Sequence, residues 1–236
     1  MSKHLSTFLK ALVGLLFLAG LGLYLFRQPI LDALIDNQLT QLGVPHSLTV
    51  EQVSLNGLVL RNLSLGEKNE LRSEEIHIGW TLKDLLKGKL QTIEISGLQL
   101  LLDLSGEKPL LGSLQKLIKD EGESGDNNFT QISLINSKLK LHTGFDDFTV
   151  NLDGNIKQES SGAQLITMVF VADATQGRAK GNLEAILDNS GKISGVLNVS
   201  EGAISLAGVN ISGVKGNSSF SLINNKPEKI TAEFIL

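Results

Sequence analysis

Apolar and polar residues alternate through most of the chain, and one eight-residue phrase of this alternation occurs three times. The copies are Val53–Leu60, Ile93–Leu100 and Ile204–Ile211, and each reads apolar-x-apolar-x-Gly-apolar-x-apolar. A looser copy, Ile132–Leu141, has Asn136 where the others have glycine. Alternation with a period of two predicts strands with one buried face.

The phase of this alternation slips by one residue at the glycine of each copy. In an unbroken strand, Val53 and Leu55 would point to one face of the sheet. Leu58 and Leu60 would point to the other face. A kink at the glycine would return all four side chains to one face, because glycine tolerates the backbone angles that a bulge requires. The predicted strand kinks are Gly57, Gly97 and Gly208.

Strand patterns with this period fill the chain from residue 44 onward. Two short helices interrupt them, one opened by the potential cap Thr81 and one by Pro109. The sequence therefore predicts a mainly β fold built from a curved sheet with one apolar face and short capping helices. The last residues, 234–236, still follow a strand pattern without protecting charges. We expect the sheet to be incomplete at its C-terminal edge, or to meet another chain there.

The N-terminal segment has a different pattern. An uncharged apolar run over 11–26 follows Lys3 and Lys10. With residues 5–9 added and Lys10 reaching the headgroups, this segment would span about 33 Å as a helix, which is enough to cross a bilayer. A cleaved signal peptide is the alternative, but bulky residues stand where a signal peptidase needs small ones. We predict a cytoplasmic tip and a transmembrane signal anchor over 1–28.

An amphipathic helix is predicted over 29–43, between the anchor and the β-part at 44–236. Pro29 suits its first turn, and Gly43 and Pro45 end it. The helix could cap the end of the sheet or lie on the bilayer surface. The cap is favoured, because its polar face carries Asp rather than the Lys and Arg of a surface-binding helix.

Composition and charge exclude several classes of function. The net charge is −4 and no basic patch is present, which argues against a nucleic-acid partner. Cysteine is absent, so disulfides, thiol catalysis and cysteine metal sites are excluded. No pair of the four histidines has helical metal-ligand spacing. The carboxylate pairs 74–75 and 146–147 are adjacent in sequence, so on a strand they would not converge. We predict no enzyme activity, no metal and no cofactor.

A resemblance to a known family emerges over Ile76–Leu100. This stretch contains a strand, Trp80, a short helix over 82–87 that Gly88 ends (letters LKDLLKG), and the second copy of the phrase. This order, behind an apolar N-terminus and the helix at 29–43, resembles the N-terminal region of the AsmA-like proteins. It is most similar to the YdbH and TamB branches, and the resemblance covers residues 5–141.

The resemblance implies a Gram-negative inner-membrane protein that crosses the membrane once and has its bulk in the periplasm. It implies an antiparallel sheet curved into an open taco-like groove, as in the chorein-like bridge lipid-transfer proteins. The chain would then be the inner-membrane-anchored segment of an intermembrane phospholipid transport protein. Phospholipid and the inner membrane are its expected partners, and the groove would carry acyl chains.

The apolar positions of the repeated phrases are the candidate lining of this groove, or of a closed core. A closed sandwich without ligand is one alternative. A membrane-tethered structural or assembly protein, whose open β-edge pairs with a partner chain without transporting a ligand, is the other. The candidate lining residues are Val53, Leu55, Leu58, Leu60, Ile93, Ile95, Leu98, Leu100, Leu139 and Leu141.

Overall fold

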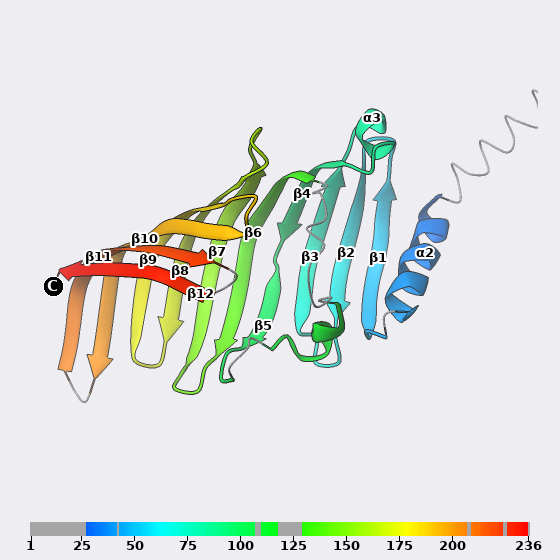
Figure 1. Cartoon of the computed structure of the whole chain (residues 1–236). Coiled ribbons are helices and arrows are strands. Elements are labelled where there is room, and N and C mark those ends of the chain that lie inside the picture. The colour runs from blue at the N-terminus through cyan, green and yellow to red at the C-terminus, as the bar shows by residue number, and fades with distance from the viewer. Residues whose placement is uncertain are drawn as a thin grey trace, which may run out of the picture.

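One large β-sheet makes up most of the molecule. The computed structural model describes residues 27–41, 43–106, 110–117, 129–206, 209–223 and 226–235. Within them the strands follow the spatial order β1-β2-β3-β4-β6-β7-β8-β9-β10-β11-β12, and β5 pairs with β3 and β6 (Figure 1). This arrangement confirms the predicted mainly β fold with one curved sheet. The strands are β1 His46–Val53, β2 Gly57–Leu65, β3 Leu71–Gly79, β4 Leu90–Ser96, β5 Gln99–Asp103, β6 Phe129–His142, β7 Asp147–Gln158, β8 Gln164–Ala174, β9 Gly177–Leu187, β10 Lys192–Leu206, β11 Val209–Ile223 and β12 Lys226–Ile235.

The sequence led us to expect an antiparallel sheet, and this expectation is wrong for one strand. β6 runs parallel to both β4 and β5, with Ile93 beside Ile132 and Leu100 beside Leu139. All other neighbouring strands are antiparallel. A parallel pair needs a long crossover instead of a hairpin, and residues 104–128 supply it.

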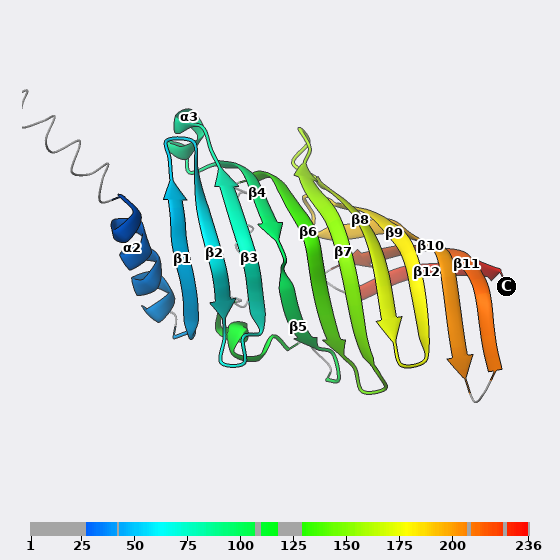
Figure 2. The ribbon, with the colours of Figure 1, turned by 180° about the vertical axis from the view of Figure 1, so that it is seen from behind.

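The sheet bends into a trough. β10–β12 pass over the face of β7–β9, in front of these strands in Figure 1 and behind them in Figure 2. Exposure distinguishes the two faces. Concave positions such as Leu152 are buried, whereas Val169 and Val196 on the convex face are 58% and 47% exposed. The apolar side of the sheet is therefore the inside of the trough.

Within the described ranges, three helical segments accompany the sheet. α2 (Arg27–Gln41) lies along β1, and its Leu31 and Ile35 pack against the β1–β2 core. This is the capping placement that the sequence favoured. α3 (Leu82–Leu85) begins at Thr81, whose side chain accepts a hydrogen bond from the Asp84 backbone N–H as predicted. The helix expected after Pro109 is a short 3₁₀ helix, η1 (Gly112–Leu117).

The predicted membrane anchor lies almost wholly outside the described residues, which begin at Arg27. Among the helices that the structure does describe, none combines the length and the apolar character needed to span a bilayer.

The first copy of the repeated phrase is a hairpin, not a bent strand. β1 ends at Val53, β2 begins at Gly57, and the Ser54 N–H donates to the Gly57 carbonyl at 2.8 Å. The predicted kink at Gly57 is therefore wrong, and the phase slip there marks a turn. The glycine is needed for a different reason: a Cβ would lie 2.7 Å from the carbonyl oxygen of Ile78 on β3.

The second copy does contain a break at its glycine. Gly97 has φ +63° and separates β4 from β5, which both pair with β6. Asn136, which replaces glycine in the looser copy, also has a positive φ of 50°. Asparagine tolerates this left-handed region better than other non-glycine residues. The third copy spans the β10–β11 connection, where Gly208 lies outside the described residues.

Candidate functional site

A continuous row of apolar residues and glycine crosses the concave face from the first strand to the last. Residues paired across neighbouring strands share a face of the sheet, so the pairing register traces this row directly. At about 4.8 Å between strands, its eleven positions span about 48 Å. In spatial order the row is Val53, Leu58, Ile78, Ile93, Ile132, Ile156, Ile166, Ala185, Gly195, Phe220 and Ile230.

The β1–β3 end of this trough is closed. Val53, Leu58 and Leu60 are 8%, 9% and 8% exposed. The α2 side chains and Trp80 cover them, and the Trp80 indole N–H donates to the Leu55 carbonyl at 2.9 Å. These candidate residues form a packed core at this end. We call this region the closed end, defined by β1–β3, α2 and Trp80.

The remaining candidate residues lie on the open part of the trough, with one exception. Ile93, Ile95, Leu98, Leu100, Leu139 and Leu141 are half-buried, and the register brings β4, β5 and β6 together in this region. Leu55 is the exception, because it lies in the β1–β2 turn and is 79% exposed. We call the concave face of β4–β12 the open floor.

Glycines on the open floor, which the sequence analysis did not identify, lie beneath large apolar side chains. A Cβ on Gly154 would be 2.7 Å from Cγ of Met168, and one on Gly181 would be 2.9 Å from Cζ of Phe170. These side chains therefore lie across the neighbouring strand. Covering a strand glycine with an aromatic ring also supports strong sheet curvature. The sequence signal for these glycines is the pairing of a small residue with a large one on the adjacent strand. This signal can be recognised only once the register of the two strands is known.

The convex face carries charged groups that pair across strands. The Arg61 guanidinium bonds Glu51 at 2.6 Å and Glu75 at 2.7 Å, and Glu75 also contacts His77. The His77 hydrogen bond, followed by the charge of Arg61, lowers the pKa of Glu75 despite some desolvation. His77 is thus on the exposed convex side, in a network of charged and polar side chains.

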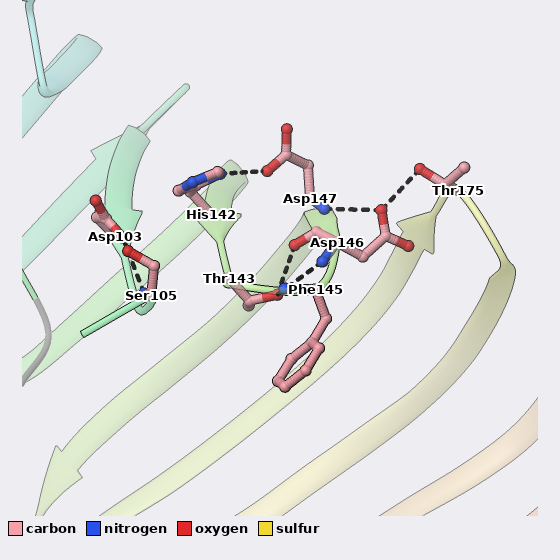
Figure 3. Close-up of polar contacts among 8 residues, drawn as sticks. All are labelled: Asp103, Ser105, His142, Thr143, Phe145, Asp146, Asp147 and Thr175. Atoms are coloured by element: carbon pink, nitrogen blue, oxygen red, sulfur yellow. Dashed lines mark hydrogen bonds and ion pairs between the residues drawn. The ribbon is translucent and has the colours of Figure 1, made fainter. Parts of the chain in front are cut away.

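A braced polar loop forms one rim of the trough, between β6 and β7 (Figure 3). The His142 ring bonds the Asp147 carboxylate at 2.6 Å, and this hydrogen bond raises the pKa of His142. The Asp146 carboxylate accepts hydrogen bonds from the Thr175 hydroxyl at 2.7 Å and from the Asp147 N–H at 2.8 Å. The Thr175 hydroxyl is the main cause of the lowered pKa of Asp146. The adjacent acidic residues 146 and 147 hold different partners and do not converge on one site.

The chemistry of the open floor is that of apolar contact. Its side chains along the row offer no hydrogen-bonding group, so they select for shape and hydrophobicity rather than for polar substituents. Within the described ranges, no group of three or more His, Asp or Glu residues could hold a metal ion. A single open sheet with one apolar face also differs from the closed sandwich that the sequence left as an alternative.

These features define the class as that of proteins built on one large curved β-sheet with an apolar concave face. Residues 15–232 match the model of the YdbH-like family, described as intermembrane phospholipid transport protein YdbH. The chain therefore belongs to the YdbH-like family, which confirms the AsmA-like resemblance. No curated protein and no solved structure gives a match to the chain.

Proposed function

We propose that this chain carries the acyl chains of phospholipids on its open floor during transport between membranes. The family model supports intermembrane phospholipid transport as the general activity. The observation that supports the acyl-chain role is the uninterrupted row of apolar residues and glycine from β1 to β12, through all the strands of this path except β5, which lies off it.

The physical reason is the match between an acyl chain and a row of floor side chains that carry no polar group. Removing each methylene from water contributes about 0.8 kcal/mol, and an acyl chain brings no polar atom that would lose hydrogen bonds. The charged headgroup would stay at the open side of the trough in contact with water. Selectivity among acyl chains should therefore be low, because adding or removing one methylene changes the binding energy only slightly.

The closed end limits where the lipid lies. Val53, Leu58 and Leu60 already contact α2 and Trp80, so an acyl chain would have to displace packed side chains to reach them. The acyl chains accordingly occupy β4–β12 and not the closed end. The apolar segment at 11–26 would anchor this end in the inner membrane, with the sheet in the periplasm.

A second candidate function, β-strand pairing with a partner chain, is favoured by the exposed edge of β12. No strand among the described residues pairs with its outer side. Ile230, Phe234 and Ile235 are 63%, 59% and 73% exposed on this strand. An unpaired edge of this length is a template for β-augmentation. In this alternative, the chain would assemble with a partner without transporting lipid.

Neighbouring residues on opposite faces of β6 provide a matched test of lipid binding. A photoreactive amino acid at Leu139 would point into the trough, whereas one at Lys140 would point away from it. After irradiation of the full chain in its native membranes, we expect phospholipid to be crosslinked at position 139 and not at 140. Equal capture at the two positions, or none at 139, would contradict the proposal.

The same approach separates the second candidate. A photoreactive amino acid at Phe234 that captures a protein chain, in a preparation where position 139 captures no lipid, would favour strand pairing without transport. Lipid at 139 together with protein at 234 would mean that both activities reside in one chain. Mass spectrometry of the crosslinked species distinguishes lipid from protein adducts.

A further inference from the structure

A pocket of about 580 Å³ opens at the rim of the trough, where the β6–β7 loop faces the β8–β9 turn. Its floor is formed by side chains of four strands that all lie on the concave side. Small alanines alternate with two larger apolar side chains, so the floor is locally hollow. The apolar residues that line this rim pocket are Phe145, Phe148, Ala172, Ala174, Ala179, Ala203 and Ile204. Gly177 and the polar residues Asp146, Gln176 and Arg178 complete the lining.

Phe145 at the edge of this pocket is unusual because its side chain is completely exposed, at 101%. A large aromatic side chain in full contact with water normally has a binding partner or packs away. Figure 3 shows the ring projecting from the loop, away from the polar groups that hold the loop. No described residue covers it.

The loop that carries Phe145 is held in place by a set of hydrogen bonds. The Thr143 hydroxyl donates to the Asp146 carbonyl at 2.6 Å and accepts from the backbone N–H groups of Asp146 at 3.0 Å and Phe145 at 3.3 Å. Asp146 is also bonded to Thr175 in the β8–β9 turn at 2.7 Å. This last bond joins the two sides of the pocket mouth. The position of the exposed ring is thus fixed by the hydrogen bonds of the loop that carries it.

We propose that the rim pocket is a discrete seat for one phospholipid acyl chain and that Phe145 forms its outer wall. The ring would lie against the acyl chain and cover the apolar surface that the alanines leave open. This inference rests on the proposed function, because it assigns a particular place on the same floor. The occupant is an acyl chain because most of the lining is apolar and is continuous with the open floor at Phe148 and Ala172, while the polar residues Asp146, Gln176 and Arg178 belong to the loop, the turn and the start of β9 at the pocket mouth.

Removing the ring provides the test. A photoreactive amino acid at the exposed pocket residue Gln176 reports the seat, and one at Leu139 reports the rest of the floor. The probe is dioleoylphosphatidylglycerol, supplied as vesicles to the full chain in detergent. We expect Phe145→Ala to lower lipid capture at position 176 by about tenfold, the loss of one large apolar contact, and to leave capture at 139 unchanged. Phe145→Trp should restore capture.

Two controls make the result specific to the seat. Leu86→Ala removes another exposed apolar side chain, 81% exposed after α3, and should change neither reading. Thr175→Val removes the hydroxyl that joins the pocket walls and should lower capture at 176 alone. Thermal unfolding should be unaffected by Phe145→Ala, since the ring is wholly exposed.

The outcomes that overturn this inference differ from those that overturn the proposed function. The acyl-chain seat is contradicted if Phe145→Ala leaves capture at position 176 unchanged. It is also contradicted if the native chain captures lipid at position 139 but never at 176. In both cases the proposed function of the open floor still stands. If the native chain captures lipid at neither position, the proposed function itself is contradicted. If Phe145→Ala weakens flotation of the chain with the vesicles while capture at 176 persists, the ring contacts a bilayer surface instead.

Discussion

Glycines on the concave face allow large neighbouring side chains to lie flat against the sheet. Gly181 on β9 shows the effect most clearly, since Phe170 lies 2.9 Å from the place of a Cβ, and the Asn198 carbonyl also crowds that position. Any side chain here must push away both a backbone carbonyl and a ring. The curvature of the trough therefore depends on single residues whose importance lies in having no side chain.

We predict that Gly181→Val destabilises the chain by about 1–3 kcal/mol, the usual cost of overpacking a well-fitted site. Gly144→Val is the matched control, because Gly144 has open space around its Cβ position and no positive φ. Thermal unfolding followed by circular dichroism measures both variants. Equal stability of the two would contradict this account of the curvature.

Glu70 is a buried carboxylate, 6% exposed, that ties η1 to the sheet. It accepts hydrogen bonds from the Lys68 N–H at 2.9 Å and from the Ser113 N–H and hydroxyl, each at 3.1 Å. Burial alone would raise the pKa of Glu70, but these hydrogen bonds together outweigh it and lower the pKa. The charged form is therefore the one that the folded state stabilises.

The lowered pKa of Glu70 fixes the sign of its pH effect. Its contribution to stability should be fully present above the ordinary glutamate pKa of 4.5 and lost as the pH falls through the lower value of the folded state. Glu70→Gln should lower the free energy of unfolding by about 1–3 kcal/mol at neutral pH, because it replaces one of the buried carboxylate oxygens that accept hydrogen bonds by an amide N–H₂ group. It should also flatten the acid limb of a stability–pH curve, whereas the exposed Glu67→Gln should not.

At the scale of elements, α2 closes one edge of the sheet, and His46 links the two. Its ring nitrogens bond the Val44 carbonyl and the Asp36 carboxylate of α2, each at 2.9 Å. The Val44 carbonyl, aided by Asp36 and opposed by burial, raises the pKa of His46. Both ring nitrogens can donate only when the imidazole is protonated.

The link between His46 and α2 should accordingly weaken at high pH. A raised folded-state pKa means that the stabilisation is fully present below the ordinary value of 6.5 and is lost as the pH rises through the folded-state value. Trp80, the only tryptophan in the sequence, packs against the same β1–β2 core as Leu31 and Ile35 of α2, so its fluorescence can report a weakened contact of this helix. Asp36→Asn should reduce the pH dependence, and an unaltered dependence would show that another group is responsible.

The sequence predicted elements better than their connections. The helix predicted over 29–43 is observed at Arg27–Gln41, and the cap at Thr81 and the break at Gly97 are also present, because each follows from local chemistry. The sequence predicts a kink at Gly57 where the structure has a turn. A one-residue shift in the alternation of apolar and polar residues occurs both in a tight hairpin and in a bulge. Local pattern cannot separate the two, since the difference lies in which strand the following residues pair with.

Pairing over long distances also decided which candidate lining residues face open space. Val53, Leu58 and Ile93 carry the same pattern in the sequence, yet α2 and Trp80 cover the first two and leave the third half-buried on the floor. The parallel placement of β6 and the stacking of Phe170 over Gly181 likewise depend on register. Phe145 carried no signal in the sequence, because its exposure only becomes informative beside the rim pocket.

At the scale of the whole molecule, the apolar side of the sheet is the inside of a trough that is closed at the β1–β3 end. The convex side carries cross-strand ion pairs such as Arg61 with Glu51 and Glu75, together with exposed apolar residues such as Val169 and Val196. This division of the two faces is the central claim, because acyl-chain binding follows from it. It predicts that contact with lipid alternates from one residue to the next along each strand.

A photocrosslinking walk along β8 tests this claim most directly. The photoreactive amino acid is placed at each position from Thr167 to Val171, in the full chain in native membranes. Phospholipid should be captured at Met168 and Phe170, which face the trough, and not at Thr167, Val169 or Val171. Capture with no alternation along these five positions, or on the convex positions alone, would contradict the account.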